Sequence, residues 1–600
     1  MAKDKLTNSQ TAQPGGAPPL PAKLAATIHG DHNPSAEVKD DPVVEEAIDD
    51  ITTHEADEVL AAEDAELAKA FEPTAKKVGF KAKVSAFFKA WWHNRKARYG
   101  TIAGLFIVIL LAAGIPQSRY FVLNNVGVRS SASVMVVDQS TQQPLKNVEV
   151  ALSNQIGKTD SEGKLKLEHL KLGQTQLVIK KRAFAVVDKK VTVGWGSNPY
   201  GDFSLTPTGS QYDFVIIDFM SGKAIGKAEV SAGEATGIAD EAGKAVLTVD
   251  PNQTSPLEVV VKAEGYRDET ISLNLDDKTE HTTKLVPARK HAFVSKRSGK
   301  YDLYSIDIDG HNEKLLLAGT GTERDNMTVV PNPAEDVVAV ASSRDNNRNR
   351  DGFLLTNLNI VDTNTGTKTN VTQSENIQIV DWIGSHLIFV QIAAGASANN
   401  PNRMRLISYD YTNNTQKELA SSNYFNDVTS ARGDIYYAPS EANTGFFRTN
   451  PEGTSRVNLL NKSTWNMFRT KYEYLTLSVG TEWYDYKLGD NAVKKLSGAP
   501  ASQQNRVYQD NSERKQSLWV ETRDGKGALI SYDTINQADK VLRTQSGLVN
   551  PAYWLNDSYV VYRVDSGQET ADYAINIDGG EPIKIGDVTN TAGKGNWYYY

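Results

Sequence analysis

Residues 291–310 read HAFVSKRSGKYDLYSIDIDG, and the architecture of the C-terminal half follows from this stretch. A strand, a polar turn, an alternating strand and an Asp-Gly turn follow one another, which is the pattern of antiparallel hairpins. A similar hairpin recurs about every 37 to 54 residues, a period typical of propeller blades. The hairpins begin at Leu303, Leu358, Leu406, Phe446, Glu482, Leu529 and Tyr573. We therefore predict a β-propeller of seven blades over residues 288–600, with six or eight blades as alternatives.

The same residues carry a resemblance to a known family. Residues 291–310 closely resemble the repeat of TolB-like propellers, and Ser342–Asp345 and Val561–Asp565 match the middle of that repeat. The C-terminal residues Asn596–Tyr600 (NWYYY) form one more predicted strand, which has no hairpin partner of its own. Because a propeller must close its ring, we expect Trp597–Tyr600 to complete the blade that begins at His291.

TolB-like propellers cap prolyl oligopeptidases, so the resemblance raises the question of catalysis. The sequence has no Gly-x-Ser-x-Gly nucleophile elbow, since the nearest match, Gly395–Asn399 (GASAN), fails at its last position. It has no His-Glu-x-x-His motif either, because His54-Glu55 is followed by Ala-Asp-Glu. The count of zero cysteines excludes thiolate nucleophiles and thiolate metal sites. We predict no catalytic, cofactor-binding or metal-binding residue, and no enzyme activity.

Two segments before the propeller, residues 134–181 and 212–266, look like copies of one module. Short alternating strands separated by Ser/Thr/Gly and Asp-x-x-Gly turns predict antiparallel β-sandwiches over residues 132–208 and 209–287. The order of these residues resembles the carboxypeptidase regulatory-like (prealbumin-like) sandwich. Domains of that family are usually spacers or binding modules on surface proteins, so the resemblance implies a stalk.

Two sequence motifs are similar to cation-binding loops. Asp160 and Asp240 each open an Asp-x-x-Gly turn, where we expect the carboxylate to accept backbone hydrogen bonds. Residues 344–352 (RDNNRNRDG) space Asp and Asn as a calcium loop does, but Arg350 replaces the required Gly and no Glu occupies the twelfth position. We interpret this segment as a solvated loop between blades.

An apolar run, Thr101–Ile115 (TIAGLFIVILLAAGI), separates these domains from the N-terminal part. With its flanks it covers residues 99–118, about the minimum length for a helix that crosses a bilayer. Basic residues precede it, so the positive-inside rule predicts a cytoplasmic N-terminus and extracellular domains after a linker at 119–131. The alternative is a cleaved secretory signal, but about 100 residues precede the run, which favours an uncleaved anchor.

The N-terminal part divides by composition. Residues 1–75 are rich in Gly, Pro and Ala and then acidic from residue 37, which predicts a disordered cytoplasmic tail. A helix induced by a cytoplasmic partner of the acidic stretch is the alternative. Residues 76–98 interleave lysines with aromatic residues and contain no acidic residue, which predicts an amphipathic segment along the inner leaflet. We therefore expect residues 76–118 to contact the lipid bilayer.

The sequence as a whole predicts a single-pass membrane protein of 600 residues. An exported part without cysteine is typical of bacteria, and the modest net charge of −8 gives no indication of nucleic-acid binding. We expect a cell-surface binding or adhesion protein whose propeller takes an extracellular protein or glycan ligand. The alternatives are an envelope scaffold or a transmembrane sensor, and an enzyme is the third.

Overall fold

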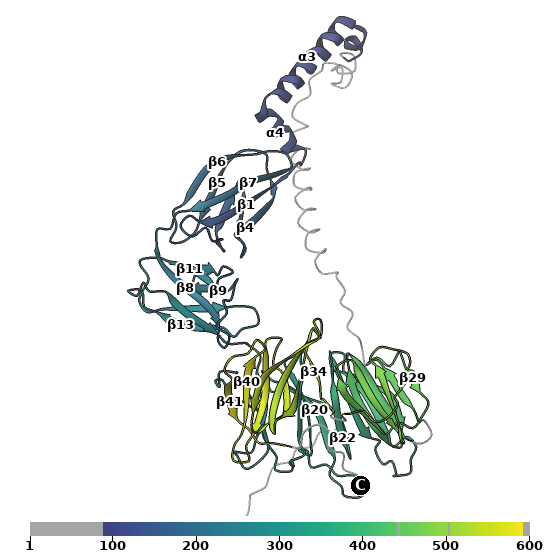
Figure 1. Cartoon of the computed structure of the whole chain (residues 1–600). Helices are drawn as coiled ribbons and strands as arrows, with labels where there is room; N and C mark the ends of the chain where they lie inside the picture. Colours follow the sequence, from purple (N-terminus) through teal and green to yellow (C-terminus); the bar gives the residue numbers. More distant parts are fainter. Residues whose placement is uncertain (1–87, 441–443, 502–504, 592–600) are drawn as a thin grey trace, which may run out of the picture. The chain divides into compact units, whose positions relative to one another are not determined.

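The computed structural model describes residues 88–440, 444–501 and 505–591 (Figure 1). Its helical part comprises residues 88–93, α3 (Arg95–Gly114) and α4 (Pro116–Asn125). The single helix predicted over residues 99–118 is therefore two helices. Ile115 has an extended backbone, because the ring of Pro116 disfavours the helical conformation in the residue before it. Within the described residues, no helix combines the length and the apolar character needed to cross a membrane.

Residues 130–205 form a domain of two sheets, which we call domain 1. A three-stranded sheet has the order β4-β1-β7 and a four-stranded sheet the order β3-β2-β5-β6. Both sheets contribute to one core, with Val136, Val150 and Ile179 fully buried. The prediction of an all-antiparallel arrangement is wrong at one position, because β1 and β7 are parallel. The strands are β1 (Ser130–Asp138), β2 (Glu149–Leu152), β3 (Gln155–Lys158), β4 (Lys164–Leu170), β5 (Gly173–Lys180), β6 (Val187–Val193) and β7 (Ser197–Leu205).

Domain 2, residues 210–285, repeats this topology. Its sheets have the orders β11-β8-β14 and β10-β9-β12-β13, and β8 and β14 are again the parallel pair. A single core contains Phe214, Ile216 and Leu247. The strands are β8 (Ser210–Asp218), β9 (Glu229–Ala232), β10 (Ala235–Ile238), β11 (Lys244–Val249), β12 (Leu257–Lys262), β13 (Glu269–Leu273) and β14 (His281–Leu285).

Seven sheets follow in chain order and form a β-propeller; we number them blades 1 to 7 (Figure 1). All seven predicted hairpins are present, each as the last two strands of a blade. Blade 1 contains β15 (His291–Ser295), β16 (Asp302–Ile306) and β17 (Lys314–Leu317), and blade 2 contains β18 (Thr328–Pro331), β19 (Val337–Ser342), β20 (Thr356–Asp362) and β21 (Lys368–Ser374). Blade 3 contains β22 (Ile377–Ile383), β23 (His386–Ile392), β24 (Met404–Asp410) and β25 (Thr415–Ser422), and blade 4 contains β26 (Phe425–Ala431), β27 (Asp434–Pro439), β28 (Phe446–Thr449) and β29 (Val457–Leu460).

Blades 5, 6 and 7 have four strands each, as blades 2, 3 and 4 do. Blade 5 contains β30 (Asn466–Lys471), β31 (Tyr474–Val479), β32 (Glu482–Lys487) and β33 (Lys494–Lys495). Blade 6 contains β34 (Gln509–Asp510), β35 (Gln516–Arg523), β36 (Lys526–Asp533) and β37 (Ala538–Gln545), and blade 7 contains β38 (Leu548–Trp554), β39 (Tyr559–Asp565), β40 (Thr570–Asn576) and β41 (Ile583–Asp587). The first strands of neighbouring blades contact one another around the channel, as β22, β26 and β30 do.

Blade 1 differs from the others because it has three described strands. After β41 the chain returns to blade 1, where the backbone N–H of Thr589 donates to the carbonyl of Val294 over 2.8 Å. Donors and acceptors alternate along a strand, so the backbone groups of Ala292 face the same side of β15 as the Val294 carbonyl. The predicted closing strand, Trp597–Tyr600, lies outside the described residues, and its role stays a prediction.

Deletion of Gly595–Tyr600 tests this prediction of ring closure. If these residues pair with β15, their loss leaves buried backbone groups without partners and lowers the free energy of unfolding by about 3 kcal/mol or more. The measurement is a urea titration followed by fluorescence, with a deletion of Met1–Glu72 as the control that leaves the propeller intact. An unchanged unfolding midpoint after the C-terminal deletion would show that the ring closes without these residues.

Candidate functional site

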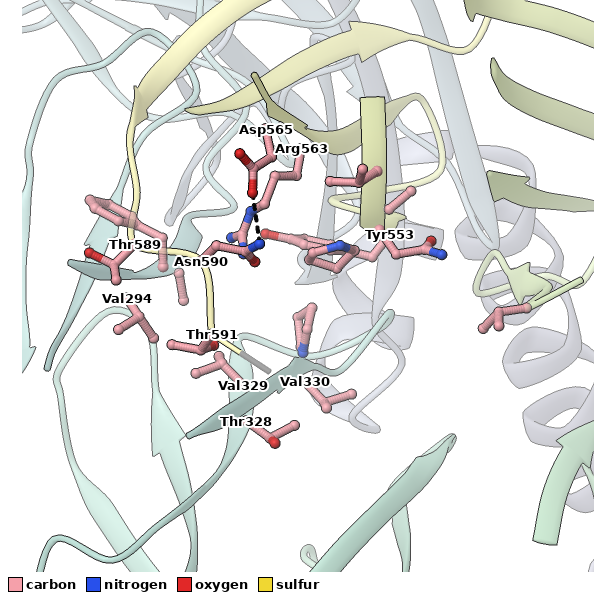
Figure 2. A pocket seen from close by; sticks show the side chains of 18 of the residues that line it. Val294, Thr328, Val329, Val330, Tyr553, Arg563, Asp565, Thr589, Asn590 and Thr591 are labelled. Atoms are coloured by element: carbon pink, nitrogen blue, oxygen red, sulfur yellow. Dashed lines mark hydrogen bonds between the residues drawn. The ribbon is translucent and has the colours of Figure 1, made fainter. Parts of the chain in front are cut away.

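A well-formed cavity of the described propeller lies in its channel, between blades 1 and 7 and next to blade 2 (Figure 2). Its volume is about 820 Å³, within the range of small-molecule sites. The walls are β15 on one side and the first strands β18 and β38 on the other. Arg563, Asp565 and Asn590 supply polar groups at one end, whereas Val294, Val329 and Val330 supply apolar surface.

A buried network of polar side chains joins blades 1 and 7 beside this cavity. Arg563 donates two hydrogen bonds to Asp572, over 2.8 and 3.0 Å. His291 Nε2 lies 3.0 Å from Asp572 Oδ2, and His291 Nδ1 is hydrogen-bonded to the Tyr553 hydroxyl. A neutral His291 satisfies both contacts if Nε2–H donates to Asp572 and Nδ1 accepts from Tyr553. The network therefore fixes the orientation of every ring and carboxylate in it.

The charged pair of blade 7 corresponds to an apolar pair in blade 1. Blades 1 and 7 share the sequence Ile-x-Ile-Asp-Gly after their central strands, and this match aligns Arg563 with Val294 and Asp572 with Leu303. The registers agree, because Val294 pairs with Leu303 across β15 and β16 as Arg563 pairs with Asp572 across β39 and β40. A buried ion pair in blade 7 thus occupies the position that blade 1 fills with two hydrophobic side chains.

Electrostatics keep this pair charged in the interior. Burial by itself raises the pKa of Asp572, but the hydrogen bonds from His291 and Arg563 outweigh it and hold the pKa below its ordinary value. Burial raises the pKa of Tyr553 well above its ordinary value, so the phenol remains a hydrogen-bond donor. Arg563 also donates to Asn590 over 3.2 Å, and Asn590 donates to Asp565 over 3.0 Å (Figure 2). The network therefore extends to the segment that follows β41.

We predict that removal of one charge from this pair is far more harmful than removal of both. Asp572→Leu leaves a buried guanidinium without its carboxylate and should cost about 3 to 5 kcal/mol in the free energy of unfolding. The double variant Arg563→Val with Asp572→Leu restores the apolar pair of blade 1 and should recover most of that loss. Urea titrations of the two single variants and the double variant measure the coupling. Additive losses would contradict the interpretation.

A second carboxylate, Asp427, links the first strands of blades 4 and 5. It is partly buried, and its Oδ2 accepts the backbone N–H of Met467 over 2.8 Å. Burial raises its pKa from 3.8 to about 6, although the backbone hydrogen bonds act in the opposite direction. Asp427 therefore keeps its proton up to a higher pH in the folded state than in the unfolded chain.

This shift predicts a pH dependence of stability. The pKa of Asp427 is higher in the folded state than in the unfolded chain. The contribution of protonated Asp427 to the free energy of unfolding is therefore complete below pH 3.8 and is lost as the pH rises through about 6. Asp427→Asn keeps an acceptor for Met467 and removes the charge, so it should raise the free energy of unfolding by about 1 to 3 kcal/mol above pH 7 and by much less near pH 4. Asp351→Asn, at an exposed loop carboxylate, is the control. A gain independent of pH would rule out this explanation.

The structure places the motifs that the sequence singled out. Asp160 Oδ1 accepts the backbone N–H groups of Glu162 and Lys164, each over 2.9 Å, and Asp240 makes the equivalent bonds, so the prediction of structural turns is confirmed. Residues 344–352 lie between β19 and β20 of one blade; the prediction of a loop between blades is wrong. In that loop Asn349 accepts backbone N–H groups of Asp351 and Phe353.

Other motifs remain without a site. Gly395–Asn399 lies in the loop between β23 and β24, whereas His54-Glu55 lies outside the described residues. Among the described residues, no group of three His, Asp or Glu side chains has the arrangement of a metal site. The Arg563–Asp572 pair was missed in the sequence. Its signal is a pair of charged residues where blade 1 has Val294 and Leu303, which appears once these two blades are aligned.

Comparisons with known proteins show similarity of fold alone. No protein-family model and no curated protein matches this sequence. Among solved structures, the propeller domain of the Trilobed protease from Pyrococcus furiosus is 10% identical, with a TM-score of 0.33 over 61% of this chain and 98% of that chain. TolB from Acinetobacter baumannii is 15% identical, with a TM-score of 0.28 over 50% and 80% of the two chains. Oligogalacturonate lyase from Vibrio parahaemolyticus is 13% identical, with a TM-score of 0.31 over 48% and 86%. The chain is thus similar to TolB-like and other propeller proteins of varied roles.

Proposed function

We propose that this chain is a membrane-anchored surface protein that binds an extracellular ligand through its propeller. In this proposal residues 76–118 contact the bilayer, domains 1 and 2 are carboxypeptidase regulatory-like sandwiches that act as a stalk, and the propeller is the binding domain. An envelope scaffold or a sensor is the alternative. Activity as an enzyme is not part of the proposal.

The observation that carries the proposal is that hydrogen bonds and ion pairs made by side chains join consecutive parts of the chain. Gln211 of domain 2 donates to Asp138 of domain 1 over 3.1 Å, and Lys146 forms an ion pair with Glu229 across the same junction. Asn124 at the end of α4 both donates to and accepts from the backbone of Leu172, each over 2.9 Å. Such bonds support a spacer that holds a binding domain in a defined position.

The junction between domain 2 and the propeller is the most strongly charged. Arg267 of domain 2 forms ion pairs with Asp307 and Asp309, which lie in the turn after β16. Asp218 of domain 2 accepts a hydrogen bond from Tyr559 at the start of β39. The carboxylates of Asp307 and Asp309 are nearly inaccessible to solvent, so these pairs are stronger than exposed ion pairs.

Exposed apolar side chains on α3 support the attachment to a bilayer. Leu105, Phe106 and Val108 each expose more than 60% of their surface, and Ile102 and Ile107 expose about half. Soluble proteins rarely leave such contiguous apolar surface without a partner. Trp92 and Tyr99, exposed by a similar fraction, have the amphipathic character of residues at a membrane interface.

The topology is tested by proteolysis of intact cells or spheroplasts. Externally added protease should degrade domains 1 and 2 and the propeller and should spare Met1–Arg98, because the basic flank keeps the N-terminus inside. Antibodies against an N-terminal and a C-terminal tag measure the outcome, and permeabilised cells are the control in which both tags are lost. Protection of the C-terminal tag with loss of the N-terminal tag would reverse the proposed orientation.

The binding role is tested by comparing cells that carry the full chain with cells that carry a chain ending at Pro287. Only the full chain should retain envelope proteins or glycans in a pull-down, because the shorter chain lacks the propeller. A third chain without Met1–Glu72 should bind as the full chain does, since the tail cannot reach across a bilayer. Loss of binding in this third chain at matched surface levels would favour the sensor.

A further inference from the structure

A second opening of the propeller channel is lined by arginines. The turns that join the first and second strands of blades 2, 3, 4 and 6 surround a cavity of about 110 Å³. A cavity of about 130 Å³ adjoins it and shares Asp381, Ser430, Arg469, Tyr508 and Gln509 with it. We call the pair of cavities the arginine mouth. Each cavity has room for several water-sized groups.

Arg469 is the buried charge of the arginine mouth. Only 4% of its surface is exposed, and it forms no ion pair with any described carboxylate. Its Nε and Nη2 groups donate to the carbonyl of Tyr472, and the rings of Tyr472 and Tyr508 lie 5.0 and 4.5 Å from the guanidinium carbon. Burial lowers the pKa of Arg469, and the carboxylates of Asp510 and Asp381, which line the same cavity, act in the opposite direction without cancelling that effect.

Two further arginines lie in strained turns at the rim. Arg432 and Arg514 have positive φ values of 53° and 55°, a conformation that glycine or asparagine adopts at lower cost. Arg514 donates to the carbonyl of Arg432 over 3.3 Å and lies across Gly433, where a side chain would collide with its guanidinium. Arg514 forms no ion pair among the described residues, and Arg432 contacts Glu473 over 3.6 Å. Strain of this kind is typical of functional sites.

The same cavity also contains an acceptor without a donor. The Oδ1 atom of Asp510 is buried and has no hydrogen-bond partner among the described residues. Asp510 lines the cavity together with Arg469 and Arg514. A guanidinium without an ion pair and a carboxylate oxygen without a hydrogen-bond donor thus line one cavity. Together they complement a ligand that carries both an anionic oxygen and a hydrogen-bond donor.

We propose that the arginine mouth binds a hydroxycarboxylate, with the carboxylate on Arg469 and Arg514 and a hydroxyl donating to Asp510. Such a unit is present in free hydroxy acids and in acidic sugars, and the shared chemistry is what the site recognises. The proposal rests on the binding role of the propeller and assigns a chemical class to its ligand. In this site Arg469 supplies the positive charge and Arg514 covers the ligand at the rim. Asp510 selects ligands that carry a hydroxyl group.

The test is isothermal titration of the full chain in detergent with three ligands built on three carbons, at constant ionic strength. Propionate has the carboxylate alone, glycerol has hydroxyls alone, and glycerate has both. Glycerate should bind about 10-fold more tightly than either of the others, because only glycerate satisfies both unpaired groups. Equal affinities for glycerate and propionate, or no binding of glycerate, would overturn the proposal.

Variants separate the roles within the site. Arg514→Gln should weaken glycerate about 10-fold. Asp510→Ala should lower the affinity for glycerate to that for propionate, without changing propionate. Arg350→Gln, at an exposed arginine in the loop after β19, is the control for lost charge and should bind as the parent does. An equal effect of Arg350→Gln and Arg514→Gln would reduce the result to general electrostatics and refute the site. Failure of glycerate with an intact pull-down by the propeller would overturn this inference alone.

Discussion

The propeller depends on how the chain pairs with the inner edge of β15, the edge opposite β16. Each blade buries its faces against two neighbours, so a ring whose first and last blades do not join exposes two apolar faces at once. Here the two blades share one core, in which Phe293 and Ile306 of blade 1 pack with Tyr559 and Val561 of blade 7. The bond from Thr589 to Val294 adds the backbone part of the closure. The buried ions next to this core make the contact specific as well as apolar.

At both junctions between domains, a bond to the next domain is made by the Asp residue that ends the first strand of the repeated module. Asp138 ends β1 and Asp218 ends β8, and each carboxylate accepts hydrogen bonds from the turn that follows it. In domain 1 the second oxygen of Asp138 accepts from Gln211 of the next domain. In domain 2 the second oxygen of Asp218 accepts from Tyr266 of the same domain. The Asp218 oxygen that accepts from the turn also accepts from Tyr559 of the propeller. A residue needed for the local turn therefore also joins the domains, which explains how a duplicated module keeps its connection when its neighbour changes.

The sequence predicts most of the fold, because the signals are local. Turn residues such as Asp309-Gly310 and Asp578-Gly579 mark the hairpins, and Asp160 and Asp240 mark turns that their own carboxylates stabilise. The parallel pairs β1 with β7 and β8 with β14 join residues far apart in sequence, and no local pattern encodes such pairing. The break at Ile115 does have a local signal in Pro116, but the apolar run around it dominates the prediction of a continuous helix.

The site residues were harder to predict, since their partners come from different blades. Arg563 and Asp572 are cross-strand neighbours, yet His291 reaches them from the opposite end of the propeller sequence. Arg469, Arg514 and Asp510 meet only because the ring brings blades 5 and 6 together at one opening. Each of these residues read alone is an ordinary charged residue of a β-rich sequence. The ring geometry gives them a common location, which a linear pattern cannot show.

The channel contains two clusters of charged side chains, and they differ in whether their polar atoms all have partners within the protein. In the network at blades 1 and 7, each polar side chain has a partner within the network, which consists of Arg563, Asp572, His291 and Tyr553. These bonds stabilise the contact between the two blades that closes the ring. In the arginine mouth, Arg469 has aromatic rings and one carbonyl but no described carboxylate in ion-pair contact, and Asp510 retains a buried oxygen without a donor. Buried polar groups are costly unless they are paired, within the protein or by a bound molecule. The network at blades 1 and 7 therefore has a structural role. In the arginine mouth, by contrast, a bound ligand can supply the partners that Arg469 and Asp510 lack within the protein.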